Sequence, residues 1–207
     1  MNGSVQLTIL NSMAGTDFEQ ALDQHVWWGL RVLDLKDAIF GKSVDDLTPQ
    51  EAEQAARLIA ARNLTVETLS TGIYYSDIEQ GETTFRAKFS TKLNRILETA
   101  PILQPSNVRL LSATSSKRST FANAADYISD QQPWVFSLYR ETIERLYEAG
   151  FQVVIELEDA SWPVTDLVNA VIRDGGSPVI CVNGSHGAKN LAYRHTMDDC
   201  PPTPIKA

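Results

Sequence analysis

Short runs of apolar residues recur along the chain, and most are followed by a stretch in which apolar residues return every three or four positions. The first pattern is typical of strands and the second of amphipathic helices. Six runs predict strands, at residues 5–10, 30–36, 64–71, 107–113, 151–158 and 177–183. The intervening segments predict helices at residues 17–29, 48–63, 84–100, 133–150 and 164–176. The pattern therefore predicts an α/β domain in which strands and helices alternate.

This alternation indicates a parallel sheet, because two parallel strands need a crossover between them, usually a helix. An open doubly wound sheet and a TIM (β/α)8 barrel both satisfy it. The first strand-to-helix turn, NSMAGTD, lacks the G-x-G-x-x-G order of dinucleotide-binding open sheets. We therefore favour a TIM (β/α)8-type barrel that is incomplete, with about six strands and helices around the sheet. The pattern predicts a partial barrel domain at residues 1–183 and an atypical tail at residues 184–207.

Charged residues lie among the apolar ones near the ends of several predicted strands. Successive side chains of a strand point to opposite faces, so the apolar residues face the helices and the charged ones face the barrel interior. The inward charges are Asp34, Lys36, Arg109, Glu156 and Glu158. Active sites of TIM barrels lie at the carboxyl ends of the strands, and a buried charge is costly unless it is paired with another charge or a metal. These residues are either structural ion pairs or a functional site, and their presence on several strands favours the site.

Two segments resemble one known family. VLDLKDAIFGKSVDDLTPQEAEQAARLIAARNLTVETLST, residues 32–71, resembles the second and third βα units of the sugar phosphate isomerase/epimerase family, the xylose-isomerase-like TIM barrels. YEAGFQVVIELED, residues 147–159, is similar to the fifth unit, whose strand end contributes a glutamate to a divalent metal. The resemblance covers most of residues 5–183 and rests on loop and strand motifs of moderate specificity.

The resemblance implies metal-assisted proton transfer. A divalent ion (Mn, Mg, Co or Zn) polarises the carbonyl of a sugar or sugar phosphate, and a proton then moves through an enediolate, which isomerises or epimerises the sugar. By position, Glu156 is the metal ligand and, with Lys36, a catalytic residue. Asp34, Arg109 and Glu158 are then candidates for substrate binding.

The chain departs from this family after residue 183. Members usually carry V-N-W-D-P-G-N there, with the aspartate as a second metal ligand, whereas this chain has VNGSHGAKN. His186 is a substitute metal ligand or, alternatively, a solvent-facing loop histidine. Because no seventh or eighth strand is predicted, we expect a C-terminally truncated barrel. The alternative function is therefore a catalytically inactive truncated barrel or a binding module.

The overall charge narrows the range of partners. The net charge is -8 and the pI about 4.9, which disfavours nucleic-acid and membrane partners and also an abasic-site endonuclease-like metalloenzyme of the same fold. The two cysteines show no metal-ligand spacing, and no signal peptide or membrane span is predicted. We expect a cytoplasmic protein that binds a small sugar. Unpaired edges of an open sheet favour a homo-oligomer.

Overall fold

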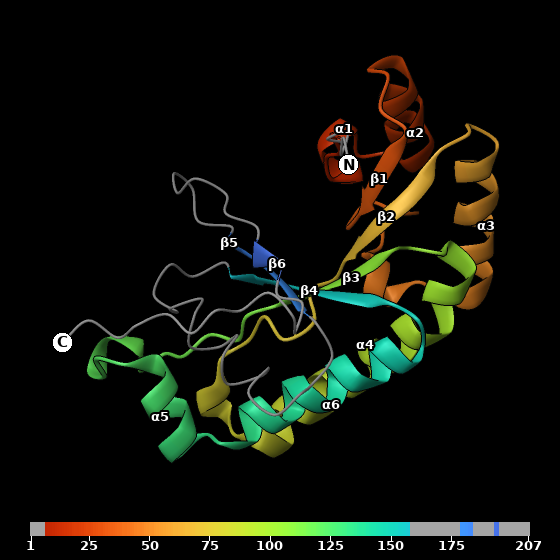
Figure 1. The fold of residues 1–207 in the computed structure, drawn as a ribbon. Coiled ribbons are helices and arrows are strands. Elements are labelled where there is room, and N and C mark those ends of the chain that lie inside the picture. The colour runs from red at the N-terminus through yellow and green to blue at the C-terminus, as the bar shows by residue number, and fades with distance from the viewer. Residues whose placement is uncertain (1–6, 158–178, 184–192, 195–207) are drawn as a thin grey trace.

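The computed structural model describes residues 7–157, 179–183 and 193–194, and its centre is one six-stranded sheet (Figure 1). Within this range the strands follow one another in chain order: β1 Val32–Leu35, β2 Thr65–Ser70, β3 Asn107–Leu111, β4 Gln152–Leu157, β5 Val179–Asn183 and β6 Tyr193–Arg194. Strands β1 to β5 are parallel, and β6 pairs antiparallel with β5. The five parallel strands correspond to the second to sixth predicted strands, which confirms the predicted α/β sheet.

The connections between strands carry the helices. The described helices are α1 Asn11–Ala14, α2 Phe18–Trp27, α3 Pro49–Ala60, α4 Glu82–Leu103, α5 Ala124–Gln131 and α6 Trp134–Glu148, with short 3-10 helices η1 Val44–Asp46, η2 Ile78–Gln80 and η3 Arg118–Thr120. Figure 1 shows α3, α4 and α6 following one another along the same side of the sheet. Within the described residues, none of the helices combines the length and the apolar character that a membrane span requires.

The hydrophobic core fills the space between the sheet and this helix layer. Alternate strand residues such as Leu33, Leu110 and Ile155 are fully buried in it, together with aromatic residues of α4 and α6. Burial of these apolar side chains is the main favourable contribution to the fold. The opposite face of the same strands is consequently left for polar residues, as the alternation predicts.

Helix α3 begins where the capping residues in the sequence predict it. The Thr48 hydroxyl accepts a hydrogen bond from the Glu51 amide at 3.3 Å, and the Glu51 carboxylate accepts one from the Thr48 amide at 2.8 Å. Pro49 occupies the first helical position, where the helix needs no hydrogen bond from the backbone nitrogen. Hydrogen bonds from Lys42 and Thr48 lower the pKa of Glu51 to about 2.

The structure differs from the sequence-based prediction near both edges of the sheet. Of the strand predicted at residues 5–10, Leu10 forms an isolated parallel bridge to Asp34, and residues 1–6 lie outside the described part. The helix predicted at residues 164–176 also lies outside it. In the segment expected to be an atypical tail, β6 pairs with β5 and so covers part of that edge.

A helix also occurs between residues 113 and 133, where the sequence predicts neither a strand nor a helix. This helix, α5, buries Ala124 and Ile128 against the core. Its apolar positions are few and lie within a polar stretch, so the spacing signal is weak.

Tyr139 of α6 joins the helix layer to the end of β3. Its hydroxyl donates to the Leu111 carbonyl oxygen at 2.6 Å and accepts from the Ala113 amide at 2.8 Å. The side chain is fully buried, and burial raises the pKa of its hydroxyl well above the usual value. One hydroxyl therefore satisfies two backbone groups at the point where β3 leaves the sheet.

The Tyr139→Phe variant is expected to lower the free energy of unfolding by about 2 kcal/mol, because it leaves a buried carbonyl and a buried amide without this partner. Urea denaturation measures the change. Tyr147→Phe on the same helix, where the side chain is half-exposed, is the matched control and is expected to change stability by no more than about 0.5 kcal/mol. Equal effects of the two changes would contradict this role of the Tyr139 hydroxyl.

Candidate functional site

Polar side chains from four neighbouring strands meet on the face of the sheet opposite the helices. We call them the inner-face cluster: Asp34 of β1, Ser70 of β2, Arg109 of β3 and Glu156 of β4. In the sheet, Ser70 is paired with Arg109 and Leu111 with Glu156. The Ser70 hydroxyl donates a hydrogen bond to Asp34, and the Arg109 guanidinium donates one to Glu156. The cluster therefore consists of two linked pairs side by side.

Arg109 lies at the centre of the cluster. Its Nη1 forms the ion pair with Glu156, and its Nη2 donates to the Thr71 carbonyl oxygen at 3.2 Å. The Thr71 hydroxyl in turn donates to the Arg109 carbonyl oxygen at 2.6 Å. The side chain of Arg109 is 9% exposed and that of Glu156 is 22% exposed. A positive charge is thus fixed in the interior at the junction of β2, β3 and β4.

Asp34 lies in surroundings that favour its neutral form. Burial raises the pKa of its carboxyl group and outweighs the hydrogen bond from Ser70 and the charges of Arg109 and Lys36, which lower it. The charge of Glu156 raises it further. Asp34 consequently takes up a proton more readily than an ordinary aspartate, which is a property of groups that transfer protons.

Lys36 completes the charged set at the end of β1. Its side chain is half-buried, and its backbone amide donates to the Asn11 side-chain oxygen at 2.8 Å. Asn11 is fully buried and also donates to the Asp37 carbonyl oxygen at 2.7 Å. Asn11 thus fixes the backbone where β1 ends. The sequence pattern does not single out Asn11, Ser70 or Thr71, since their only signal is their place at a strand end.

The structure brings together three residues that the sequence predicts for the site, Asp34, Arg109 and Glu156, with Lys36 close enough to act on Asp34. Glu158 and His186 lie outside the described residues.

The predicted metal site is described only at Glu156, because His186 lies outside the described residues. Glu156, the predicted metal ligand, has a guanidinium as its partner. In this part, no three His, Cys, Asp or Glu side chains gather closely enough to hold a metal ion. The described residues therefore do not by themselves fit a divalent cation.

The loops at the carboxyl ends of β2 and β3 are tied together. Glu79 of η2 accepts hydrogen bonds from Ser115 at 2.7 Å and Tyr127 at 2.8 Å, and it pairs with Lys117 at 2.9 Å. These contacts fix the connection after β3 at the same end of the sheet as Glu156. The charge of Lys117 is paired within the protein.

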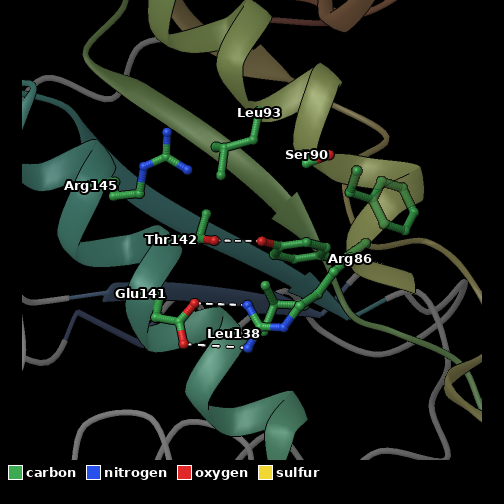
Figure 2. A pocket seen from close by; sticks show the side chains of 9 residues that line it. Arg86, Ser90, Leu93, Leu138, Glu141, Thr142 and Arg145 are labelled. Atoms are coloured by element: carbon green, nitrogen blue, oxygen red, sulfur yellow. Dashed lines mark hydrogen bonds and ion pairs between the residues drawn. The ribbon is translucent and has the colours of Figure 1, made fainter. Parts of the chain in front are cut away.

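A cavity of about 200 Å³ lies elsewhere, between α4 and α6 in the helix layer (Figure 2). Arg86 of α4 donates to both carboxylate oxygens of Glu141 on α6, at 2.8 and 3.3 Å. The hydroxyls of Tyr74 and Thr142 form a second contact across it, and burial raises the pKa of Tyr74 to about 12. Arg86 and Glu141 join α4 to α6, Tyr74 joins the turn after β2 to α6, and none of these residues belongs to the inner-face cluster.

Comparison with known proteins gives matches among solved structures, whereas no family model and no curated protein matches the chain. A magnesium-bound xylose isomerase-like TIM barrel protein from Mycobacterium smegmatis is 16% identical, with a TM-score of 0.57 over 79% of this chain and 55% of that one. The 3-keto-D-glucoside 4-epimerase of E. coli is 13% identical, with a TM-score of 0.64 over 87% and 68%. The chain has the fold of the xylose-isomerase-like TIM barrels. It spans between about half and two thirds of the length of these matched proteins.

Other activities occur on this xylose-isomerase-like fold. A family 2 AP endonuclease from Brucella melitensis is 16% identical, with a TM-score of 0.57 over 86% of this chain and 67% of that one. Similarity at this level of identity establishes the fold alone, and the activity must be argued from the side chains of the site.

Proposed function

We propose that this chain acts as a sugar isomerase or epimerase, which moves a proton at the carbon next to a carbonyl group. The observation that carries the proposal is the inner-face cluster, where a buried guanidinium lies beside a carboxyl group whose pKa is raised. One structure of the same fold is that of an epimerase of a keto-glucoside, which supports a sugar or sugar phosphate as substrate by analogy. The acidic net charge disfavours the nuclease alternative.

The reaction needs a base and a positive charge near the carbonyl oxygen. In our proposal the Asp34 carboxylate takes the proton from the carbon next to the carbonyl, and an enediolate forms. Arg109 and Lys36 supply the charge that stabilises its oxygens. Return of the proton to the opposite side of the same carbon gives an epimer, and return to the neighbouring carbon gives the aldose or ketose isomer. The atoms balance without any other reactant.

The roles of Asp34 and Glu156 in this proposal differ from those that the resemblance implies. The resemblance gives Glu156 the catalytic and metal-binding roles, whereas in the structure this carboxylate holds Arg109. We therefore assign the proton transfer to Asp34 and the positioning of Arg109 to Glu156. A divalent metal bound by Glu156 and His186 stays an expectation from the resemblance, and no step is assigned to it.

The experiment incubates the full chain with D-fructose, D-xylose and D-fructose 6-phosphate and follows the appearance of a new sugar by NMR. The proposal predicts an epimer or isomer of at least one of them. If no sugar is converted, and none raises the temperature of unfolding, the proposed function is contradicted.

The raised pKa of Asp34 also predicts a pH-dependent effect on stability. The pKa of Asp34 is higher in the folded than in the unfolded chain, so folding favours its protonated form. Above the folded pKa, ionised Asp34 therefore lowers the free energy of unfolding. This loss disappears as the pH falls toward the ordinary value of 3.8. Asp34→Asn is expected to raise the free energy of unfolding at neutral pH, and the gain should vanish in acid. Thermal unfolding over a pH series measures it. A variant that is less stable than the wild type at neutral pH would contradict this assignment.

A further inference from the structure

The partner of Glu156 is the feature of the site that differs most from the expectation. The resemblance places a divalent cation against this carboxylate, and the structure places the guanidinium of Arg109 there. We propose that Arg109 takes the place of the metal, so that the site binds a carbonyl or enediolate oxygen of its ligand without a divalent ion. This inference rests on the proposed function and names the group that recognises the ligand oxygen.

The contacts of Arg109 leave donors for a ligand. A guanidinium carries five N–H groups, and the described contacts use one from Nη1 for Glu156 and one from Nη2 for Thr71. Its Nε is buried and has no hydrogen-bond partner in the described part of the protein. Arg109 therefore has the capacity to bind a further oxygen while both present contacts persist.

Among the described residues, the charges of the site are balanced without a metal when the Asp34 carboxyl group is ionised. Asp34 and Glu156 supply two carboxylates, and Arg109 and Lys36 supply two positive charges. Hard divalent cations are held by an excess of carboxylate oxygens. A metal at Glu156 would have to bind beside a guanidinium that does not lose its proton, and the two positive charges would repel each other. The arrangement thus favours Arg109 over a metal as the fixed positive charge.

A fixed guanidinium supplies the positive charge that the proposed reaction requires. Negative charge develops on the carbonyl oxygen as the proton leaves, and a preorganised donor at that place stabilises it. Glu156 and Thr71 hold the guanidinium in position, so both act as positioning residues.

The test measures metal binding by the full chain after treatment with EDTA. Unfolding temperatures are recorded in EDTA and in millimolar MgCl2 or MnCl2, and bound Mn²⁺ is measured by equilibrium dialysis. We expect no response of the wild type that depends on Glu156, and a new metal-dependent rise of the unfolding temperature in Arg109→Met, whose Glu156 has lost its guanidinium partner. Arg57→Met, an exposed change on α3, is the matched control and should show no new metal-dependent rise of the unfolding temperature.

Metal binding by the wild type that is lost in Glu156→Gln would overturn the inference. If Arg109→Met does not fold, the dialysis of the wild type and of Glu156→Gln still decides between the two outcomes. Sugar conversion separates this inference from the proposed function. Conversion that requires Mn²⁺ and Glu156 would overturn only the inference. If no sugar is converted and the unfolding temperature does not respond to metal, only the proposed function is contradicted.

Discussion

Asp34→Asn is expected to slow proton exchange at the sugar carbon about 10²- to 10⁴-fold, the usual contribution of a positioned acid or base. An amide keeps the acceptor for the Ser70 hydroxyl but does not take up the proton. Incorporation of solvent deuterium into the sugar, followed by NMR, measures the rate. Because the same change is expected to stabilise the protein at neutral pH, a loss of exchange in Asp34→Asn is not explained by unfolding.

Two further variants separate the role of Asp34 from a general effect of charge. Asp130→Asn makes the same chemical change at an exposed position of α5 and should leave exchange at the wild-type rate. Ser70→Ala removes the hydrogen bond to Asp34 and should shift the pH profile of exchange upward, since that bond lowers the pKa of Asp34. Exchange in Asp34→Asn at the wild-type rate would show that another group carries the proton.

Arg109→Met is expected to lower the free energy of unfolding by about 3 kcal/mol. Removal of one member of a buried ion pair leaves the other without compensation, which typically costs about 3 to 5 kcal/mol. The lower end applies here because the Glu156 side chain is 22% exposed and retains contact with water. Urea denaturation measures the loss. The exposed change Arg57→Met on α3 is expected to alter stability by no more than about 0.5 kcal/mol.

A double-mutant cycle isolates the interaction between Arg109 and Glu156. In the Arg109→Met, Glu156→Leu double variant neither charge is left alone, so its loss of stability should be smaller than the sum of the two single losses by about 2 kcal/mol. Strictly additive losses would mean that the two groups do not interact in solution.

Most of the fold follows from local patterns in the sequence. The alternation of strand and helix periods predicts the five parallel strands of the described sheet, and the Thr48–Glu51 capping box predicts the start of α3. The short helix α5 is not predicted, because it contains few apolar residues and lies within a polar stretch.

The contents of the site follow from the sequence only in part. Strand alternation places Asp34, Arg109 and Glu156 on one face, as the structure confirms. Which of them pair is set by strand register, and the register between β1 and β2 shifts between Leu33 and Asp34. Such a shift leaves no local mark in the sequence, so the contact between Ser70 and Asp34 was not predictable. The pairing of Arg109 with Glu156 likewise depends on how β3 and β4 align.

Deuterium exchange by the wild-type chain is the decisive measurement of proton transfer at the inner-face cluster. The chain is treated with EDTA and incubated in deuterated buffer with D-fructose, D-xylose or D-fructose 6-phosphate, and NMR follows the hydrogen on the carbon next to the carbonyl. We expect this hydrogen to be replaced by deuterium faster than in buffer alone, for at least one sugar and without added metal. Exchange at the buffer rate for all three sugars, with and without Mn²⁺, would contradict proton transfer at the inner-face cluster.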